Sequence, residues 1–262
     1  MKILEVKNLE IKLRESNKEI IKNISFSMEE NTCLGILGES GSGKSVTCKS
    51  ILNILNDNFR VNGEIIFNGK NLIDCTEKEM KNIRGKQICM ILQNPMTSFD
   101  PLFTIQNQMV ETFLEHLDIS SKEALDLAKE SLEKMRMKEI DAVLKKYPHE
   151  LSGGMLQRVM VAIIIGLDSK IIIADEVTSA LDSYNRYEMI KIFKELNKMG
   201  KSIILITHDY YLMKSISDRC LVMENGEVIE EFNPKLEAEL IKENSEFGAK
   251  LLETTIYKRK GS

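Results

Sequence analysis

The chain has 262 residues, of which 43% are hydrophobic and 29% are charged, and its formal net charge is −4. A chain of this length and composition can bury a hydrophobic core of ordinary size, in one large domain or two lobes. Its 36 Lys and Arg residues form no basic block, which argues against nucleic acid as a partner. No window holds ~18 uncharged apolar residues, the length that spans a bilayer, so a membrane role would need a partner chain.

The cysteines and the first residues indicate the compartment. The five cysteines show no CxxC or other paired spacing, which is typical of reduced thiols in a cytosolic protein. Residues 1–7 alternate charged and apolar side chains, which predicts a strand and not the continuous apolar core of a signal peptide.

Short apolar runs dominate the first part of the chain and predict strands. They lie at 2–6, 9–13, 20–27, 33–37, 63–69 and 88–92. The first three alternate apolar and polar residues, which favours an antiparallel group. The fourth is continuously apolar, which predicts a buried strand, and it leads through a glycine-rich turn into a helical pattern from Val46 to Leu55.

The turn after the fourth run matches G-x-x-x-x-G-K-[ST], the pattern of a phosphate-binding loop. Its residues are Gly38, Glu39, Ser40, Gly41, Ser42, Gly43, Lys44 and Ser45, and Val46 opens the helix. The glycines allow the backbone to curl so that successive N–H groups point at phosphate oxygens. We expect Lys44 to reach the β- and γ-phosphates of a nucleotide and the Ser45 hydroxyl to bind Mg²⁺.

Residues 105–167 have helical character. Ser120 and Glu123 form a predicted capping box before a helix over 124–135. The sequence Tyr147-Pro148-His149 interrupts the pattern, and Leu151-Ser152-Gly153-Gly154 opens the next helix.

The start of that last helix predicts a second anion site. Ser152, Gly153 and Gly154 offer a hydroxyl and unobstructed N–H groups at a helix N-terminus. Because the chain already has a complete phosphate loop, we expect this site to close over a nucleotide that another subunit holds. Gln157, in the continuation Met155-Leu156-Gln157-Arg158, is assigned to the same surface. Two chains arranged head to tail would then enclose two ATP molecules.

Strands and helices alternate in the last third of the chain. The predicted elements are strands at 171–174 and 203–206, a helix at about 184–199, a hairpin at 220–229 with an Asn-Gly turn, and a charged helical tail from 234. Two carboxylates, Asp175 and Glu176, follow the first of these strands. Asp175 suits coordination of Mg²⁺, and Glu176 suits polarisation of the attacking water.

Two other polar side chains follow predicted strands. Gln93 comes after the run 88–92, and His208 comes after the run 203–206 and Thr207. Ligands bind at strand ends in open α/β sheets, so both side chains are predicted to reach a γ-phosphate. His116 and His149 lack such neighbours, and we expect them to be surface histidines.

This order of elements predicts an α/β fold, namely a P-loop NTPase core whose mixed sheet includes N-terminal antiparallel strands, with an inserted helical subdomain. The ATP-binding core is expected over 1–93 and 166–232, and the helical subdomain with the LSGG motif over 94–165. Residues 233–262 are expected to form a charged helical tail without a chemical role.

Taken together, these motifs resemble the ATP-binding subunit of ABC transporters over residues 1–232. The resemblance implies that Gln93 is the Q-loop glutamine, that 151–158 is the signature, and that Asp175-Glu176 is Walker B. It further implies that Ser179-Ala180-Leu181-Asp182 is the D-loop and that His208 is the switch histidine.

The resemblance also implies a reaction and an assembly. ATP would be hydrolysed with Glu176, His208 and Gln93 as catalytic residues, and Mg²⁺ would be held by Ser45, Gln93 and Asp175. The partners would be a second ABC ATPase subunit, in a homodimer or heterodimer, and two membrane-spanning permease subunits. An extracytoplasmic substrate-binding protein would contribute indirectly. The chain would be peripheral, on the cytoplasmic face of the cell membrane.

Finer features are similar to the oligopeptide/dipeptide/nickel importer class. Gln93-Asn94-Pro95, Tyr147-Pro148 and Met155-Leu156-Gln157-Arg158 look most like the nickel-import ATPase. The chain also ends at Ser262 without the cysteine-containing extension common in peptide importers. We therefore expect uptake of nickel or a related metal or metal chelate, with a dipeptide or oligopeptide importer as the alternative.

Two residues depart from the family pattern. Leu13 stands about where many members place an adenine-stacking aromatic residue, and Val177 replaces the usual proline after the Walker B glutamate. Both leave the predicted hydrolytic residues in place.

Two other function classes fit less well. A soluble ABC ATPase that acts on ribosomes or DNA usually has two cassettes or a long coiled coil, and this chain has one cassette. A P-loop switch protein would have no use for LSGG.

Overall fold

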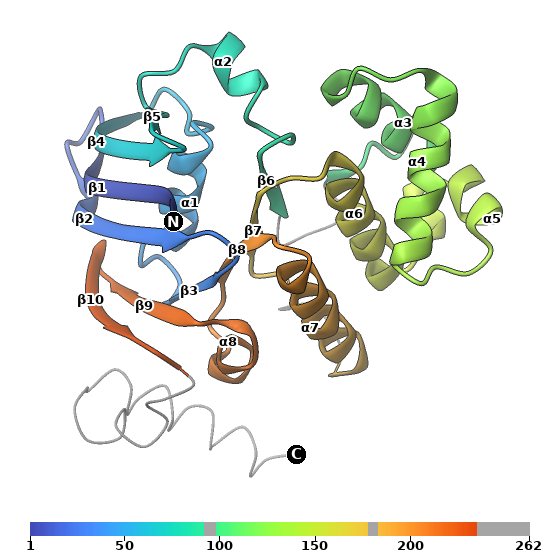
Figure 1. The fold of residues 1–262 in the computed structure, drawn as a ribbon. Coiled ribbons are helices and arrows are strands. Elements are labelled where there is room, and N and C mark those ends of the chain that lie inside the picture. Colours follow the sequence, from blue (N-terminus) through green and yellow to red (C-terminus); the bar gives the residue numbers. More distant parts are fainter. Residues whose placement is uncertain (92–97, 178–182, 235–262) are drawn as a thin grey trace. The chain divides into compact units, whose positions relative to one another are not determined.

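The computed structural model describes residues 1–91, 98–177 and 183–234 (Figure 1). The chain folds as two compact units, and each is described by itself. The first consists of Met1–Cys75 and the chain from Leu196 onward, and the second is Thr76–Glu195. The predicted limits of the helical subdomain, 94–165, remain a prediction.

An antiparallel sheet opens the first unit. Its strands are β1 (Lys2–Leu13), β2 (Glu19–Glu29), β4 (Phe59–Phe67) and β5 (Lys70–Asn71), in the order β2-β1-β4-β5. The runs 2–6 and 9–13, predicted as separate strands, form the single strand β1. Asn8 adopts a φ of 48° within it, and its pairing register shifts at this point on both sides. A β-bulge therefore replaces the predicted break, because one residue can leave the ladder without ending the strand.

A second group of strands in the first unit carries the phosphate loop. Strands β8 (Ser202–Ile206) and β9 (Arg219–Glu224) both pair in parallel with β3 (Cys33–Leu37), and β10 (Glu227–Phe232) pairs antiparallel with β9. Every residue of β3 and β8 is buried, which explains the apolar runs 33–37 and 203–206. The helices of this part are α1 (Lys44–Ile51) and α8 (Tyr210–Ile216). The predicted Asn-Gly hairpin is confirmed, with Asn225 and Gly226 both at positive φ.

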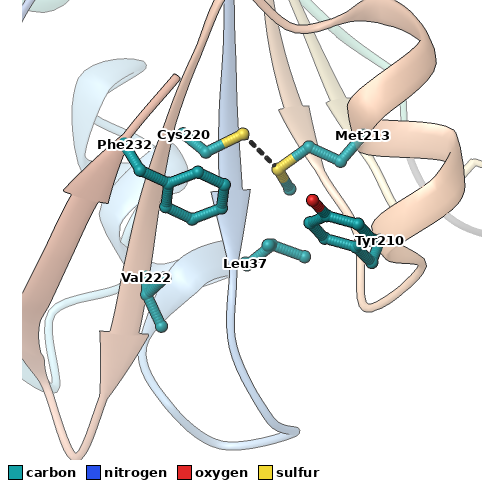
Figure 2. Close-up of a cluster of buried hydrophobic side chains, with 6 residues drawn as sticks. All are labelled: Leu37, Tyr210, Met213, Cys220, Val222 and Phe232. Atoms are coloured by element: carbon teal, nitrogen blue, oxygen red, sulfur yellow. Dashed lines mark hydrogen bonds between the residues drawn. The ribbon is translucent and has the colours of Figure 1, made fainter. Parts of the chain in front are cut away.

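A cluster of buried side chains packs around the end of β3 (Figure 2). Its members are Leu37, Tyr210, Met213, Cys220, Val222 and Phe232. Burial raises the pKa of the Cys220 thiol, which donates to the Met213 sulfur at 2.6 Å. Leu37 is the last residue before the phosphate loop and pairs with Val222 of β9. The cluster therefore fixes the point at which the chain leaves the sheet.

The second unit combines two parallel strands with a group of helices (Figure 1). Its elements are α2 (Glu77–Lys81), β6 (Ile88–Ile91), α3 (Ile105–His116), α4 (Ser121–Lys134), α5 (Ile140–Lys145), α6 (Gly153–Leu167), β7 (Ile171–Asp175) and α7 (Ser183–Lys198), within which the division between the units falls. Strand β6 pairs in parallel with β7. The fully buried Phe113 of α3 packs where Gly166 of α6 has no side chain, since a Cβ there would lie 2.5 Å from the phenyl ring.

Two sequence predictions about this unit are confirmed. Ser120 caps α4, because its Oγ accepts from the Glu123 N–H at 3.3 Å and its own N–H donates to the Glu123 carboxylate at 2.7 Å. Helix α6 begins at the LSGG motif, with Ser152 as its N-cap. In the described ranges, no helix is both long and apolar enough to cross a membrane. All five cysteines are free and buried.

Candidate active site

The phosphate loop lies between β3 and α1 in the first unit. Lys44 is only 5% exposed, and its Nζ donates to the carbonyl oxygens of Gly38 and Glu39, both at 2.7 Å, and to Ser42 Oγ at 3.4 Å. These bonds hold the ammonium group inside the loop. Glu39, Ser40 and Gly41 are exposed, so the loop has a fixed interior and an open rim.

Neighbouring strands brace this loop from outside. A Cβ at Gly38 would fall on the carbonyl oxygen of Met223, the next-to-last residue of β9. A Cβ at Gly43 would fall on the side chain of Ile21 in β2, and Gly43 has a φ of 104°. The hairpin turn after β9 also contacts the loop, because the Gly226 N–H donates to the Ser42 carbonyl at 3.2 Å. Glycine at 38 and 43 is thus required by the packing of the chain itself.

His208 lies at the same end of the parallel strands as the phosphate loop. It follows β8, which pairs with β3, and the Thr207 N–H donates to the Ile36 carbonyl at 3.3 Å. His208 is exposed. The first unit therefore brings together two of the predicted site elements, as parallel strand ends require.

Asp175 and Glu176 occupy the corresponding end of β7 in the second unit. Asp175 is the last residue of the strand and is 8% exposed, and Glu176 is half-buried with a φ of 48°. This φ is uncommon for a residue with a side chain and costs on the order of 1–3 kcal/mol, so it persists only where surrounding contacts fix it. Gln93 and the predicted D-loop, Ser179–Asp182, lie outside the described residues.

The signature residues at the start of α6 face open space. Ser152 and Gly153 are exposed, and a Cβ at Gly153 would have no atom within 4 Å. Ser152 Oγ accepts from the Met155 N–H at 3.3 Å. Gln157 differs from these residues, because its side chain is only 2% exposed and donates through Nε2 to the Val177 carbonyl. The expectation that Gln157 belongs to the exposed signature surface is therefore corrected.

A cavity of about 380 Å³ adjoins the signature. Four basic residues and one acidic residue, Glu139, line it together with Ser152 and Gly154; the basic residues are Arg136, Lys138, Lys146 and Arg158. Such a concentration of positive charge favours anionic ligands. These cations have no place in the predicted site, although all four lie within 16 positions of Ser152 in the sequence, a clustering of charge that could have revealed them.

The two remaining histidines differ from each other. His149 is exposed and stacks on Tyr147, with ring centroids 5.7 Å apart, as expected for a surface residue. His116 is half-buried, and its imidazole lies where a Cβ of Gly85 would stand. Burial lowers the pKa of His116. His116 therefore lies only partly at the surface, against the turn at Gly85.

Comparisons with known proteins agree with the fold and the family resemblance that the sequence motifs indicate. The model of the ABC transporter family matches residues 21–179. The metal-staphylopine import system ATP-binding protein CntD of Staphylococcus aureus is 39% identical over 232 residues, which are 88% of this chain and 86% of that protein. The oligopeptide transport ATP-binding protein OppD of Bacillus subtilis is 39% identical over 234 residues, 87% of this chain and 65% of that protein.

A solved structure extends the comparison to the fold. It is the dimer of the ATP-binding cassette MJ0796 in a post-hydrolysis state bound to ADP and Pi. The match has a TM-score of 0.77 and 26% sequence identity, and it covers 88% of this chain and 99% of that chain. The predicted fold class is confirmed.

Proposed function

This chain belongs to the ABC transporter family, as an ATP-hydrolysing subunit of the importer class, and we propose that it couples ATP hydrolysis to the uptake of nickel or a related metal chelate. The metal cargo is supported by the S. aureus relative, whose name specifies metal-staphylopine import. Import of dipeptides or oligopeptides is the second candidate, because the B. subtilis relative has the same 39% identity.

The phosphate loop is proposed to bind the triphosphate of ATP. Its N–H groups and the N-terminus of α1 favour negative charge. Lys44 would exchange its carbonyl partners for β- and γ-phosphate oxygens, which bind an ammonium group more strongly because they are charged. The hydroxyl, carboxylate and amide oxygens of Ser45, Asp175 and Gln93 are the hard ligands that suit Mg²⁺, which supplies positive charge to the phosphate oxygens when bound.

Glu176 is proposed to orient and deprotonate the attacking water, with His208 holding the γ-phosphate. Two observations support this assignment. Glu176 immediately follows the buried strand β7 and adopts a strained backbone conformation, a feature that concentrates at functional sites. His208 follows β8, which lies directly beside the strand that leads into the phosphate loop.

The signature is proposed to complete the active site of a second ATPase subunit. The observation that carries this proposal is the contrast between two anion sites in one chain. Gly38 and Gly43 of the phosphate loop are packed against their own unit, whereas Ser152 and Gly153 are exposed beside a cavity lined by four cations. A γ-phosphate brought by another chain fits the second site, since N–H groups and basic side chains both attract it.

The helices of the second unit are proposed to dock against two membrane-spanning permease subunits, which would hold the chain at the cytoplasmic face of the membrane. Leu102 and Phe103 are 78% and 49% exposed, and Leu114 lines a groove between α3 and α4. Exposed apolar side chains of this size are typical of interaction surfaces. Gln93 would link the γ-phosphate to movement of this region.

Replacement of the proposed base tests the hydrolytic mechanism. Glu176→Gln keeps the size of the side chain but cannot accept a proton, so we expect the rate of hydrolysis to fall at least about a hundredfold while ATP still binds. Glu133→Gln, an exposed position on α4, serves as the matched control and should hydrolyse ATP normally. Hydrolysis by Glu176→Gln near the rate of the unmodified chain would show that another group is the base.

Uptake measurements test the cargo. Cells that lack this gene would be complemented with the unmodified chain or with Glu176→Gln and supplied with radiolabelled Ni²⁺, with or without a chelator, or with a radiolabelled dipeptide. The metal proposal predicts restored Ni²⁺ uptake with the unmodified chain alone. Restored dipeptide uptake without Ni²⁺ uptake would instead establish the peptide importer, and restoration of neither would contradict an importer of these two cargo classes.

A further inference from the structure

Gln157 joins the signature helix α6 to the chain just after β7 through a side-chain hydrogen bond to a backbone carbonyl. It lies five positions after the N-cap Ser152 on α6, a helix of 15 residues. Its side chain is 2% exposed and donates through Nε2 to the carbonyl of Val177. Its Oε1 is buried and has no hydrogen-bond partner among the residues that the structure describes.

This side chain is a costly choice for a packing role. A buried amide oxygen without a partner is unfavourable, whereas an apolar side chain of similar size would fill the same space without that cost. Leu156, Val159 and Met160, three of the residues near Gln157 along the helix, are buried and apolar. The hydrogen bond from Nε2 to the Val177 carbonyl, and not packing, therefore explains a glutamine at this position.

That carbonyl belongs to the residue that follows the proposed base. Val177 is 3% exposed and comes directly after Glu176, whose φ is 48°. A strained conformation persists only where neighbouring contacts fix it. Asp175 is held on the N-terminal side by β7, and the bond from Gln157 holds the peptide on the C-terminal side. The backbone of Glu176 is thus fixed at both ends.

We propose that Gln157 is a positioning residue for Glu176 and that it links the two nucleotide sites that one chain serves. The proposal rests on the role of Glu176 in the proposed function. Through Ser152 and Gly153, α6 contacts the nucleotide of a second subunit, and through Gln157 the same helix holds the base for its own nucleotide. The two contact points lie about 7.5 Å apart along one rigid helix axis. A shift of α6 when the signature engages a γ-phosphate would therefore move the Val177 carbonyl and the carboxylate before it.

The first test removes the donor without removing its volume. Gln157→Met should lower kcat about tenfold, with little change in KM for ATP, because the hydrogen bond that positions the chain after Glu176 is lost. The thermal unfolding midpoint should change little, because the substitution also removes the buried oxygen that has no partner. Met160→Leu, a buried and volume-conserving change on the same helix, is the matched control and should keep kcat. Unchanged kcat in Gln157→Met, or a fall in stability without a fall in kcat, would overturn the proposal.

The second test restores the donor by pH. In Gln157→Glu, burial raises the pKa of the introduced carboxyl, and only its protonated form can donate to the Val177 carbonyl. The ratio of its kcat to that of the unmodified chain should therefore rise severalfold between about pH 8.5 and about pH 6. A ratio that does not change with pH would contradict the positioning role, because a side chain that only fills space has no such dependence.

Combination with the base variant separates this proposal from the proposed function. If Gln157 acts through Glu176, Gln157→Met should reduce the residual single-turnover hydrolysis of Glu176→Gln by less than about twofold. A further tenfold loss of hydrolysis in the double variant would show that Gln157 does not act through Glu176, but it would leave Glu176 as the base. Normal hydrolysis by Glu176→Gln alone would instead remove the premise, whatever the result for Gln157.

Discussion

The phosphate loop and the start of α6 both present glycines and helix N–H groups to an anion, yet the chain supports them in different ways. Gly38 and Gly43 have no room for a Cβ, and Lys44 is buried among loop carbonyls. Gly153 has open space around it, and Ser152 is exposed. Fold stability therefore accounts for the first set of glycines, whereas nothing in the described part of this chain requires a glycine at 153.

This contrast teaches that the two motifs can be separated by experiment. A substitution in the phosphate loop should alter the chain itself, whereas a substitution in the signature should alter only what the chain does with a second subunit. Alanine is also a better helix former than glycine by up to about 1 kcal/mol. At position 153, helix stability therefore favours alanine, whereas the proposed phosphate contact favours glycine.

The largest effect is expected for Lys44→Ala. It removes the charge that is proposed to bind the β- and γ-phosphates, and it removes the bonds from Nζ to Gly38, Glu39 and Ser42. ATP hydrolysis should fall by at least about a hundredfold, and ATP binding should weaken as well. Lys49→Ala, a half-buried residue on the same helix, is the control. Normal ATP binding by Lys44→Ala would break the comparison, because the loop would then not be the nucleotide site.

A smaller effect, on folding, is expected for Gly38→Ala. The new Cβ would meet the Met223 carbonyl, and we expect the free energy of unfolding to fall by about 2 kcal/mol or more. Gly69→Ala is matched to it, because Gly69 also has a positive φ but no atom within 4 Å of a Cβ. Its cost should be only about 1 kcal/mol, from backbone strain. Chemical denaturation of both variants measures the difference, and equal losses would argue against the packing explanation.

Ser152→Asp tests whether the signature serine affects hydrolysis without affecting the stability of α6. Aspartate is as good an N-cap as serine, so the stability of α6 should be retained within about 0.5 kcal/mol. Its negative charge would repel the proposed γ-phosphate and lower hydrolysis about tenfold. The same change at Ser120, the N-cap of α4, should affect neither property. An equal loss of hydrolysis in both variants would indicate a general effect of the added charge.

The smallest effect is expected for the pH dependence of the second unit. Burial lowers the pKa of His116 below its ordinary value, with Glu115 opposing and Lys86 adding to the shift. The unfolded chain therefore binds the proton first, and stability should decrease as the pH falls below the ordinary pKa of histidine. Thermal unfolding at about pH 7 and about pH 5 should show a larger loss for the unmodified chain than for His116→Gln. An equal loss would mean that other groups cause the dependence.

Local sequence signals predicted much of this structure. The Asn225-Gly226 turn, the Ser120–Glu123 capping box and the buried strand before the phosphate loop each follow from a few adjacent residues with strong conformational preferences. The same capping signal at Thr76 and Glu79 begins α2, a helix that is absent from the predicted elements although its capping pattern is present in the sequence.

Other features depend on contacts that adjacent residues do not specify. The runs 2–6 and 9–13 predict two strands, but pairing on both sides continues one strand through a bulge at Asn8. The side chain of Gln157 was assigned to the surface because of its motif, and its apolar neighbours were the signal that it is buried and needs a partner. The carbonyl partners of Lys44 likewise depend on how the loop curls.

Gly153→Ala tests most directly the claim that the signature completes the site of another subunit. ATP affinity would be measured on the purified full chain, and hydrolysis on the same variant assembled with its transporter partners. We expect affinity within about twofold of the unmodified chain, unfolding no easier, and hydrolysis lower by at least about tenfold, because the Cβ blocks close approach of a phosphate. Hydrolysis at the normal rate, or a loss of ATP affinity that matches the loss of hydrolysis, would contradict the account.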